Sequence, residues 1–283
     1  MNSKTVKAEQ KPKDISKFSD KAKLLYERIG EHTASAANNS IATTEALIRH
    51  LQRISISTSV VNSFHSCPNY LLPPISEQYE DCRSAIIMHQ GSDLEFILQT
   101  FYLGAFQRLE IYLSKLHQSI LETYPEAIFN DPSGHYKGGI SYPDLIESSS
   151  IEILRRKIIS KITKDKVQQL SIVDLITKSF VPYGNFKVEV NDANIEMIVK
   201  FSAKRNVLIH NGGIVNEVYI STLRHAKLKP DLKIGEKVPL GLEVLKTTNQ
   251  FVILLCASFA DQLIKHLPQI EKHFASKRQE FSS

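Results

Sequence analysis

The sequence predicts an all-α protein. Apolar residues recur at intervals of three or four from Leu94 to Ile120, the spacing that places them on one face of a helix. Most other segments show the same helical spacing. In "KIGEKVPL", by contrast, apolar and polar residues alternate around a glycine. We therefore expect a helical bundle, with one short strand or β-hairpin near residues 232–240.

The N-terminal residues form a separate segment. Residues 1–14 are expected to be a disordered basic arm. Helical spacing then covers 17–53 in two pieces, joined by the poor helix former "TASAANNS". The stretch "CPNYLLPP" carries three prolines, which break any helix. We expect a helical N-terminal segment of unknown role at 15–75 and the main domain at 76–275.

A long helix is the best-specified element of the main domain. A shorter helical segment is expected before it, at 76–90, with Gly91 as the break. Ser92–Glu95 has the pattern of a capping box, in which serine and glutamate side chains bond the free backbone N–H groups. Pro125 ends the helix, and the polar loop "NDPSGHYKGGISYPD" follows.

Helical spacing also covers most of the remaining chain. Further helices are expected at 149–164, 167–180, 191–206, 214–227 and 242–265. A turn at 182–185 precedes the third of these helices, which Asn191 or Asp192 caps. Residues 276–283 are expected to form a disordered tail.

Composition indicates a soluble, cytoplasmic protein, because 42% of the residues are apolar and 23% are charged. The most apolar run, "FVILLCASFA", is about half the length of a membrane-spanning helix. No apolar stretch follows the first lysines, as a secretory signal requires. The three cysteines lie far apart, outside any Cys-x-x-Cys pattern. We therefore expect no disulfide framework, no metal, no cofactor and no membrane.

The net charge of +5 is unevenly distributed. Residues 1–25 contain seven lysines and three acidic residues, a net charge of +4, so the rest of the chain carries only +1. A flexible basic arm attracts polyanions, although such arms more often keep a terminus soluble. The charge therefore permits nucleic acid as a partner without implying it.

Several catalytic patterns are absent. The glycines in "SGHYKGG" lack the spacing of a phosphate-binding P-loop and do not lie between a strand and a helix. The ten histidines form neither a His-x-x-x-His nor an HExxH pattern, which excludes a typical zinc hydrolase. Glu110 lies beside the apolar stripe, where an exposed or i,i+4-paired carboxylate is the ordinary interpretation.

The segment "KRNVLIHNGG" is the strongest candidate for a functional site. Arg205 and His210 stand five positions apart, and Asn-Gly-Gly follows. The ordinary interpretation is a helix end, since cations there are favoured by about 0.3–1 kcal/mol and Asn-Gly commonly stops a helix. The alternative is that the arginine and the histidine handle a phosphate.

Helix geometry limits what one chain can do with this pair. Over five residues an uninterrupted helix turns by about 140° and rises by about 7.5 Å, so Arg205 and His210 would not share a face. They act together only if the helix bends or ends between them, or if a second subunit completes the site. The glycines after His210, the long arginine side chain and the frequency of twofold dimers favour such an arrangement.

The segment "RNVLIHN" resembles the Arg-x(4–6)-His motif of the ribonuclease-type HEPN superfamily, all-α proteins in which a polar residue commonly follows the arginine. The helix that leads into the motif, the run "HNGGIVNEVY", the later "KIGEKVPL" and the final helix follow the order of one HEPN branch. The long helix also suits the early core helix of that branch. The similarity covers about residues 77–270 and implies a HEPN-like helical bundle.

The resemblance implies metal-independent RNA cleavage at the interface of a homodimer, leaving 2′,3′-cyclic phosphate and 5′-OH ends. RNA carries its own nucleophile, the 2′-OH. His210 would take the 2′-OH proton or protonate the leaving 5′ oxygen. Arg205 would stabilise charge on the pentacoordinate phosphate, and Asn206 would orient the phosphate or the imidazole. Weaker candidates for substrate binding are Lys204, Asn211 and Tyr219, of which the last two are equally well explained as structural.

Three functions stay open. The first is an endoribonuclease acting as a toxin or antiviral defence effector, as many HEPN proteins do, with a regulatory protein partner. The second is a non-catalytic HEPN-like module that binds RNA, a nucleotide or a protein. The small net charge outside the arm favours this module. The third is a structural helical dimer in which Arg205 and His210 only finish a helix.

Overall fold

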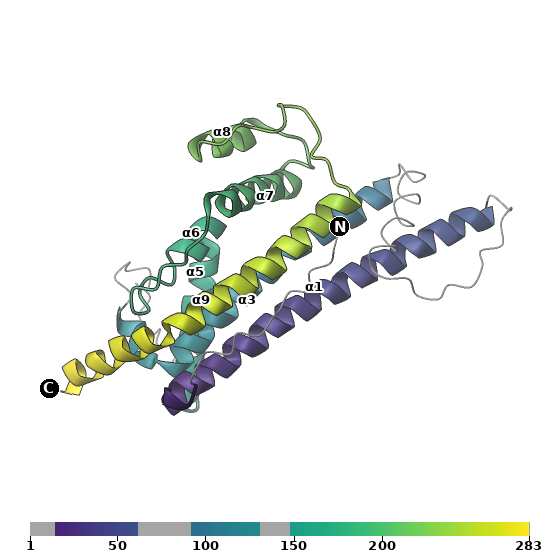
Figure 1. Cartoon of the computed structure of the whole chain (residues 1–283). Coiled ribbons are helices and arrows are strands. Elements are labelled where there is room, and N and C mark those ends of the chain that lie inside the picture. Colours follow the sequence, from purple (N-terminus) through teal and green to yellow (C-terminus); the bar gives the residue numbers. More distant parts are fainter. Residues whose placement is uncertain (1–14, 62–91, 131–147, 283) are drawn as a thin grey trace. The chain divides into compact units, whose positions relative to one another are not determined.

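The all-α prediction is confirmed by the computed structural model, which describes residues 15–61, 92–130 and 148–282 (Figure 1). Within these ranges the regular structure is helical, apart from one isolated antiparallel bridge between Ile214 and Lys237. Some expectations lie outside the described residues. They are the arm at 1–14, the proline-rich break, the helix at 76–90, two of the three cysteines and the polar loop after residue 130.

One continuous helix, α1 (Asp20–Val61), replaces the two pieces predicted for the N-terminal segment. A 3-10 helix, Ile15–Lys17, precedes it. Hydroxyl groups along α1 bond back to its own carbonyls: Thr33 Oγ1 donates to Ile29 O at 2.7 Å, and Thr44 Oγ1 to Ser40 O at 2.9 Å. Such bonds accommodate polar side chains inside a helix, so the predicted interruption was wrong.

The long helix is confirmed as α3 (Ser92–Thr123). Its apolar stripe is buried, including Leu98, Tyr102, Ala105, Leu109, Tyr112, Leu116 and Ile120. The backbone N–H of Tyr124 still donates to Ile120 O at 2.7 Å. A 3-10 helix, Pro125–Asn130, begins at the proline predicted to end the α-helix.

The next two helices are α5 (Ile151–Gln169) and α6 (Ile172–Thr177). Each begins after a serine, Ser150 or Ser171, whose hydroxyl accepts the backbone N–H three residues later. The break between the two helices therefore lies at 170–171 and not at the predicted 165–166, because Ser171 is the N-cap of α6. The predicted turn at 182–185 is confirmed, with Gly184 and Asn185 at positive φ.

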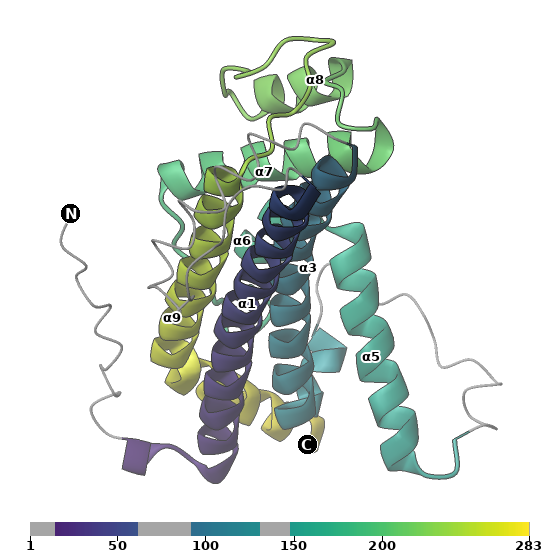
Figure 2. The same ribbon diagram turned by 90° about the vertical axis from the view of Figure 1, so that its right-hand side faces the viewer.

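The candidate motif lies on α7 (Asp192–His210), which Asn191 caps as predicted. The following helix, α8 (Glu217–His225), is shorter than the predicted 214–227 because Asn216 is its N-cap. Both views show α8 beside α7 (Figure 1 and Figure 2). Apolar residues of both helices belong to one buried cluster, which fixes α8 against α7.

The segment expected to form a strand or hairpin pairs instead with residues just after α7. The backbone N–H of Val215 donates to Glu236 O at 2.8 Å, and that of Gly235 donates to Val215 O at 2.9 Å. Val238 N–H donates to Gly213 O at 2.8 Å. Residues 235–238 are therefore tied to 213–215, and 232–240 does not form a hairpin with itself.

The last helix, α9 (Leu242–Ser282), is longer than predicted. It runs past residue 265 and through Pro268, so the predicted helix end and the disordered tail at 276–283 were wrong for residues up to 282. By length and composition alone, Leu242–Gln279 is a candidate membrane span. Many of its apolar side chains are buried in the protein, among them Val252, Leu255, Cys256, Phe259 and Leu263. This pattern also fits a core helix.

The chain divides into two compact units that interleave in sequence. Unit 1 comprises Met1–Thr33, Leu113–Glu189 and Ser258–Ser283, and unit 2 comprises Ala34–Tyr112 and Val190–Ala257. The helices α1, α3 and α9 therefore each contribute residues to both units. These two units do not correspond to the expected N-terminal segment at 15–75 and main domain at 76–275.

Unit 1 has an aromatic core around a buried histidine, His117. Its ring stacks on Phe180 at 3.8 Å between centroids. Ser179 Oγ donates to Leu175 O, so it accepts from His117 Nε2 at 2.8 Å. The Tyr183 hydroxyl then donates to Nδ1 at 2.9 Å. These bonds select the neutral tautomer with its proton on Nε2.

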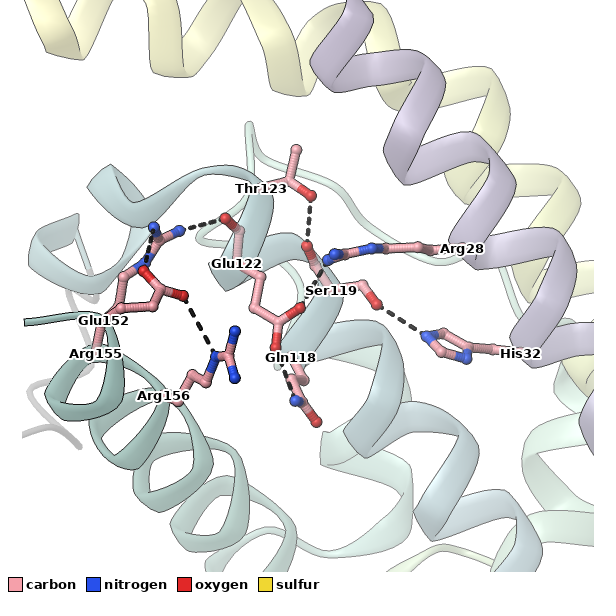
Figure 3. Close-up of polar contacts among 9 residues, drawn as sticks. All are labelled: Arg28, His32, Gln118, Ser119, Glu122, Thr123, Glu152, Arg155 and Arg156. Carbon is pink, nitrogen blue, oxygen red and sulfur yellow. Dashed lines mark hydrogen bonds and ion pairs between the residues drawn. The ribbon is translucent and has the colours of Figure 1, made fainter. Parts of the chain in front are cut away.

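Unit 1 also contains a polar layer that joins α1, α3 and α5 (Figure 3). Arg28 of α1 pairs with the Glu122 carboxylate at 2.7 Å. His32 Nε2 lies 2.9 Å from Ser119 Oγ, and Arg155 of α5 donates to the backbone carbonyl of Glu122. Partial burial lowers the pKa of His32. The layer gives these half-buried polar groups partners across three helices.

Unit 2 is built around one large apolar cluster. Its buried members come from α1, α3, α7, α8, α9 and the two loops on either side of α8. They include Leu47, Leu98, Tyr102, Val207, Leu208, Tyr219, Leu223, Val238 and Leu245. Tyr102 also donates its hydroxyl to Phe201 O at 3.2 Å. The N-terminal segment is thus part of this core, which gives α1 a structural role.

Candidate active site

The candidate site is set by the way α7 ends. Asn211 is the C-cap, and its backbone N–H donates to Val207 O at 2.9 Å. Gly212 and Gly213 follow at φ of 58° and 82°, where L side chains are strained. Gly213 N–H also donates to Val207 O, at 3.1 Å. The Asn-Gly-Gly sequence therefore stops the helix directly after His210, as predicted.

Arg205 is held by a carboxylate of α3. Its Nη1 lies 3.2 Å from Glu110 Oε1, and its Nη2 donates to Glu110 Oε2 at 3.4 Å. Both side chains are partly buried, with 31% of Arg205 and 23% of Glu110 exposed. The prediction of an exposed or i,i+4-paired Glu110 was wrong, because its partner is 95 residues away in sequence.

Arg205 and His210 lie on one uninterrupted helix, since α7 is helical through His210. Their side chains leave the helix about 140° apart. The helix neither bends nor ends between the two residues, because the glycine break follows His210, whose side chain is exposed. Asn206 is also exposed and stands one turn before His210, about 40° away. One chain thus brings Asn206, and not Arg205, to the histidine's face.

Lys204 and Tyr219 meet at a residue that sequence reasoning missed, Asp231. Lys204 Nζ lies 2.8 Å from Asp231 Oδ2, and the Tyr219 hydroxyl donates to Oδ1. Burial and the Asp231 carboxylate raise the pKa of Tyr219. Partial burial raises the pKa of Asp231, but the bonds from Lys204 and Tyr219 outweigh it and lower this pKa overall. Tyr219 is almost fully buried, which favours the structural interpretation of this residue.

Asn211 also has a structural partner. Its side-chain Nδ2 donates to the backbone carbonyl of Ile214, within the turn that leads out of α7. Ile214 N–H in turn donates to Asn211 O at 3.0 Å. These reciprocal bonds explain the asparagine at this position by turn formation.

Exposed apolar side chains are found on the segments that surround the end of α7. They are Ile209, Ile214, Val218 and Ile234. The backbone pairing of 213–215 with 235–238 ties two of these segments together. Several exposed apolar side chains on neighbouring segments are typical of a surface that contacts another protein, whereas single exposed apolar residues are common on any protein.

No sequence signal could have identified Glu110 or Asp231 as partners of the motif. Both pairings join residues distant in the chain, and acidic residues are common on helix surfaces and in loops. In the described part of the chain, no group of three or more His, Cys, Asp or Glu side chains is arranged to hold a metal ion.

Comparisons of the chain with known families, characterised proteins and solved structures give no match. The likeness to the HEPN superfamily therefore rests on the motif and on the order of helices around it.

Proposed function

We propose that the protein is a metal-independent endoribonuclease of the HEPN type, with RNA as its substrate. The observation that carries this proposal is the set Arg205, Asn206 and His210 at the end of α7. His210 and Asn206 are exposed, and Arg205 is oriented by Glu110. An exposed imidazole and a fixed guanidinium can supply the proton transfer and the charge stabilisation that phosphodiester cleavage by an internal 2′-OH needs.

The chemistry follows from these groups. The 2′-OH oxygen of RNA attacks the adjacent phosphorus, and the P–O5′ bond breaks to leave a 2′,3′-cyclic phosphate and a 5′-OH end. His210 accepts the 2′-OH proton or protonates the departing 5′ oxygen, and water serves the other transfer. Arg205 stabilises the added negative charge on the phosphate.

The proposed active form is a homodimer with a composite site. Arg205 and His210 diverge on one helix, so Arg205 of one protomer and His210 of the partner subunit would face the same phosphate. The exposed apolar side chains around His210, such as Ile214 and Val218, support contact with a second copy. Action in the cytoplasm as a toxin or defence effector, under a regulatory protein, is part of this proposal.

The direct test is RNA cleavage in EDTA by the wild type, Arg205→Ala and His210→Ala. We expect each substitution to reduce the rate by about 10²–10⁴-fold. Product ends are identified by enzymatic labelling of 5′-OH groups. His225→Ala, an exposed histidine on the last turn of α8, is the matched control. Equal cleavage by the wild type and the two motif variants would exclude the proposal.

The composite site has its own test. Arg205→Ala and His210→Ala chains are co-expressed and assayed as a mixture. Random pairing gives half heterodimers, each with one intact site of two, so about a quarter of wild-type activity should return. A mixture as inactive as the separate variants would exclude a site shared in this way.

One observation favours a second candidate, a non-catalytic module that binds RNA, a nucleotide or a protein. Glu110 occupies one edge of the Arg205 guanidinium and partly neutralises it. RNA binding that survives both motif substitutions, with no turnover by the wild type, would support this module instead.

A further inference from the structure

α5 is the most basic helix in the described part of the chain. Ile151–Gln169 contains six basic and two acidic residues, a net charge of +4. The other α-helices have net charges between −2 and +1. The small net charge of the whole chain therefore conceals one strongly basic element.

The charge of α5 is concentrated on one face, termed the basic face and formed by Arg156, Lys157, Lys161 and Lys164. With about 100° of turn per residue, these four cations fall within about 140° of arc and extend about 12 Å along the helix. The acidic residues Glu152 and Asp165 fall outside this arc. The side chains of Arg156, Lys161 and Lys164 are exposed.

The opposite face of α5 is packed inside unit 1. Ile159, Ile162 and Thr163 are buried there, and Lys166 lies 5.4 Å from the centre of the Tyr183 ring. Figure 3 shows the division at two neighbouring arginines: Arg155 reaches α3, whereas Arg156 stays beside Glu152 of its own helix. The protein therefore holds α5 with its basic face turned outward, while Arg155 and Lys166 point inward.

This arrangement distinguishes nucleic acid from a membrane as the partner. A helix that lies on a membrane inserts an apolar face below its basic residues. On the inner face of α5, Ile159 and Ile162 are buried, and the exposed apolar side chains of this helix, Ile151 and Ile153, lie in its first turn. Two exposed isoleucines in one turn do not form an apolar face along the whole row of cations, so this row is better suited to a linear polyanion, whose phosphates release counterions on contact.

We propose that the basic face of α5 binds the sugar-phosphate backbone of single-stranded RNA, without regard to sequence. This inference rests on the proposed function, because it takes RNA as the substrate. It adds a binding surface on unit 1 to the candidate active site on unit 2. Backbone contacts of this kind give affinity and not sequence discrimination.

The test measures RNA binding separately from cleavage. The full chain with His210→Ala is titrated against a fluorescent 20-nucleotide oligouridine by anisotropy, over a range of salt concentrations. The same chain with Arg156→Gln, Lys161→Gln and Lys164→Gln is compared, since glutamine keeps a good helix former at each position. We expect affinity to fall by about 10- to 100-fold near 0.1 M salt, and the log–log salt slope to shrink by about 2.

A control with scattered cations tests whether the clustering matters. Lys21→Gln, Lys187→Gln and Lys272→Gln remove the same charge from exposed lysines on three different segments. The inference predicts a much smaller loss for this control. Equal losses in both triple variants, or no loss in the α5 variant, would overturn it. Binding of anionic phospholipid vesicles in place of RNA by the parent chain would also overturn it.

The outcomes separate this inference from the proposed function. If the wild type cleaves RNA but the α5 variant binds it as tightly as the parent, the inference fails and the nuclease stands. If the α5 variant loses RNA binding but the wild type cleaves nothing, the basic face stands and the nuclease fails.

Discussion

Glu110 and Arg205 form a two-point ion pair between α3 and α7. The carboxylate contacts both Nη atoms, at 3.2 and 3.4 Å. A guanidinium has a second edge, formed by Nε and one Nη, which also presents two parallel N–H groups. Among the described residues, Arg205 has no other polar partner. The pair therefore fixes the direction of the arginine and leaves one edge for a phosphate.

We predict that Glu110→Ala lowers RNA cleavage even though it removes a negative charge from the site. Without the carboxylate the long arginine side chain samples many rotamers, and misplacement of a charge-stabilising group by about 1 Å costs about 10²-fold in rate. We expect a fall of 10- to 100-fold in kcat with little change in KM, measured by steady-state cleavage with single-turnover confirmation. A rise in activity would mean that Glu110 blocks the phosphate position and does not orient Arg205.

The matched control for this substitution is Glu122→Ala. Glu122 is also on α3 and pairs with an arginine, Arg28, at 2.7 Å, with 29% of its side chain exposed. Glu122→Ala shows how much cleavage is lost when α3 loses an ion pair that does not involve Arg205. If both variants lose kcat equally, the effect comes from stability and not from the orientation of Arg205.

A second prediction concerns Tyr219, whose hydroxyl donates to the Asp231 carboxylate. Tyr219→Phe keeps the buried ring and removes this bond, so we expect a loss of about 1–3 kcal/mol in the free energy of unfolding. Cleavage per folded molecule should be unchanged, because the ring is buried away from solvent. Urea unfolding and an active-fraction assay measure the two effects. A fall in kcat without a loss of stability would indicate that Tyr219 contributes to substrate binding or catalysis.

The helices were largely predictable because their signals are local. Apolar spacing located α3, and Asn191 located the start of α7, since caps and periodicity act over a few residues. The continuity of α1 and the length of α9 were missed because packing overrides weak local propensity. The pairing of 235–238 with 213–215 was missed because nothing in either segment specifies its partner.

The candidate site was predictable only as a list of residue types. The motif identified Arg205 and His210, and helix geometry correctly placed them apart on one chain. Glu110 and Asp231 required the fold, because each pairs with a residue that is distant in sequence. The basic face of α5 is visible in the sequence once its helix bounds are known, but the buried opposite face is not.

A third prediction uses the close approach of Gly184 to α9. A Cβ at this position would lie 3.1 Å from Ile270 Cα and 3.2 Å from Gln269 O, and the backbone φ is +67°. Gly184→Ala therefore combines a strained dihedral with an unusually tight contact against helix backbone, which cannot rotate away as a side chain can. We expect a loss of about 2–4 kcal/mol in the free energy of unfolding, measured with urea.

Gly235→Ala separates the two causes. Gly235 has a φ of +83° with nothing within 4 Å of an added Cβ, so only the dihedral strain of about 1–2 kcal/mol applies. If Gly184→Ala is no more destabilising than Gly235→Ala, the contact with α9 does not limit the size of residue 184.

The last prediction concerns the pH dependence of stability and rests on His117. Burial, with a smaller contribution from Lys166, holds the pKa of His117 well below 6.5. In the unfolded chain the same imidazole takes up a proton near pH 6.5. Below that pH the unfolded state binds one more proton than the folded state. The stabilising contribution is therefore complete above about pH 6.5 and is lost as the pH falls.

We expect His117→Gln to flatten the stability profile between about pH 6.5 and pH 5. Glutamine can bond Ser179 and Tyr183 but does not titrate in this range, so the variant should lose up to about 1.4 kcal/mol of slope per pH unit. Urea unfolding at several pH values measures this slope, and His225→Gln, an exposed histidine of α8, is compared in parallel. An equal flattening by His225→Gln, or an unchanged slope in His117→Gln, would show that His117 is not the group whose protonation destabilises the fold.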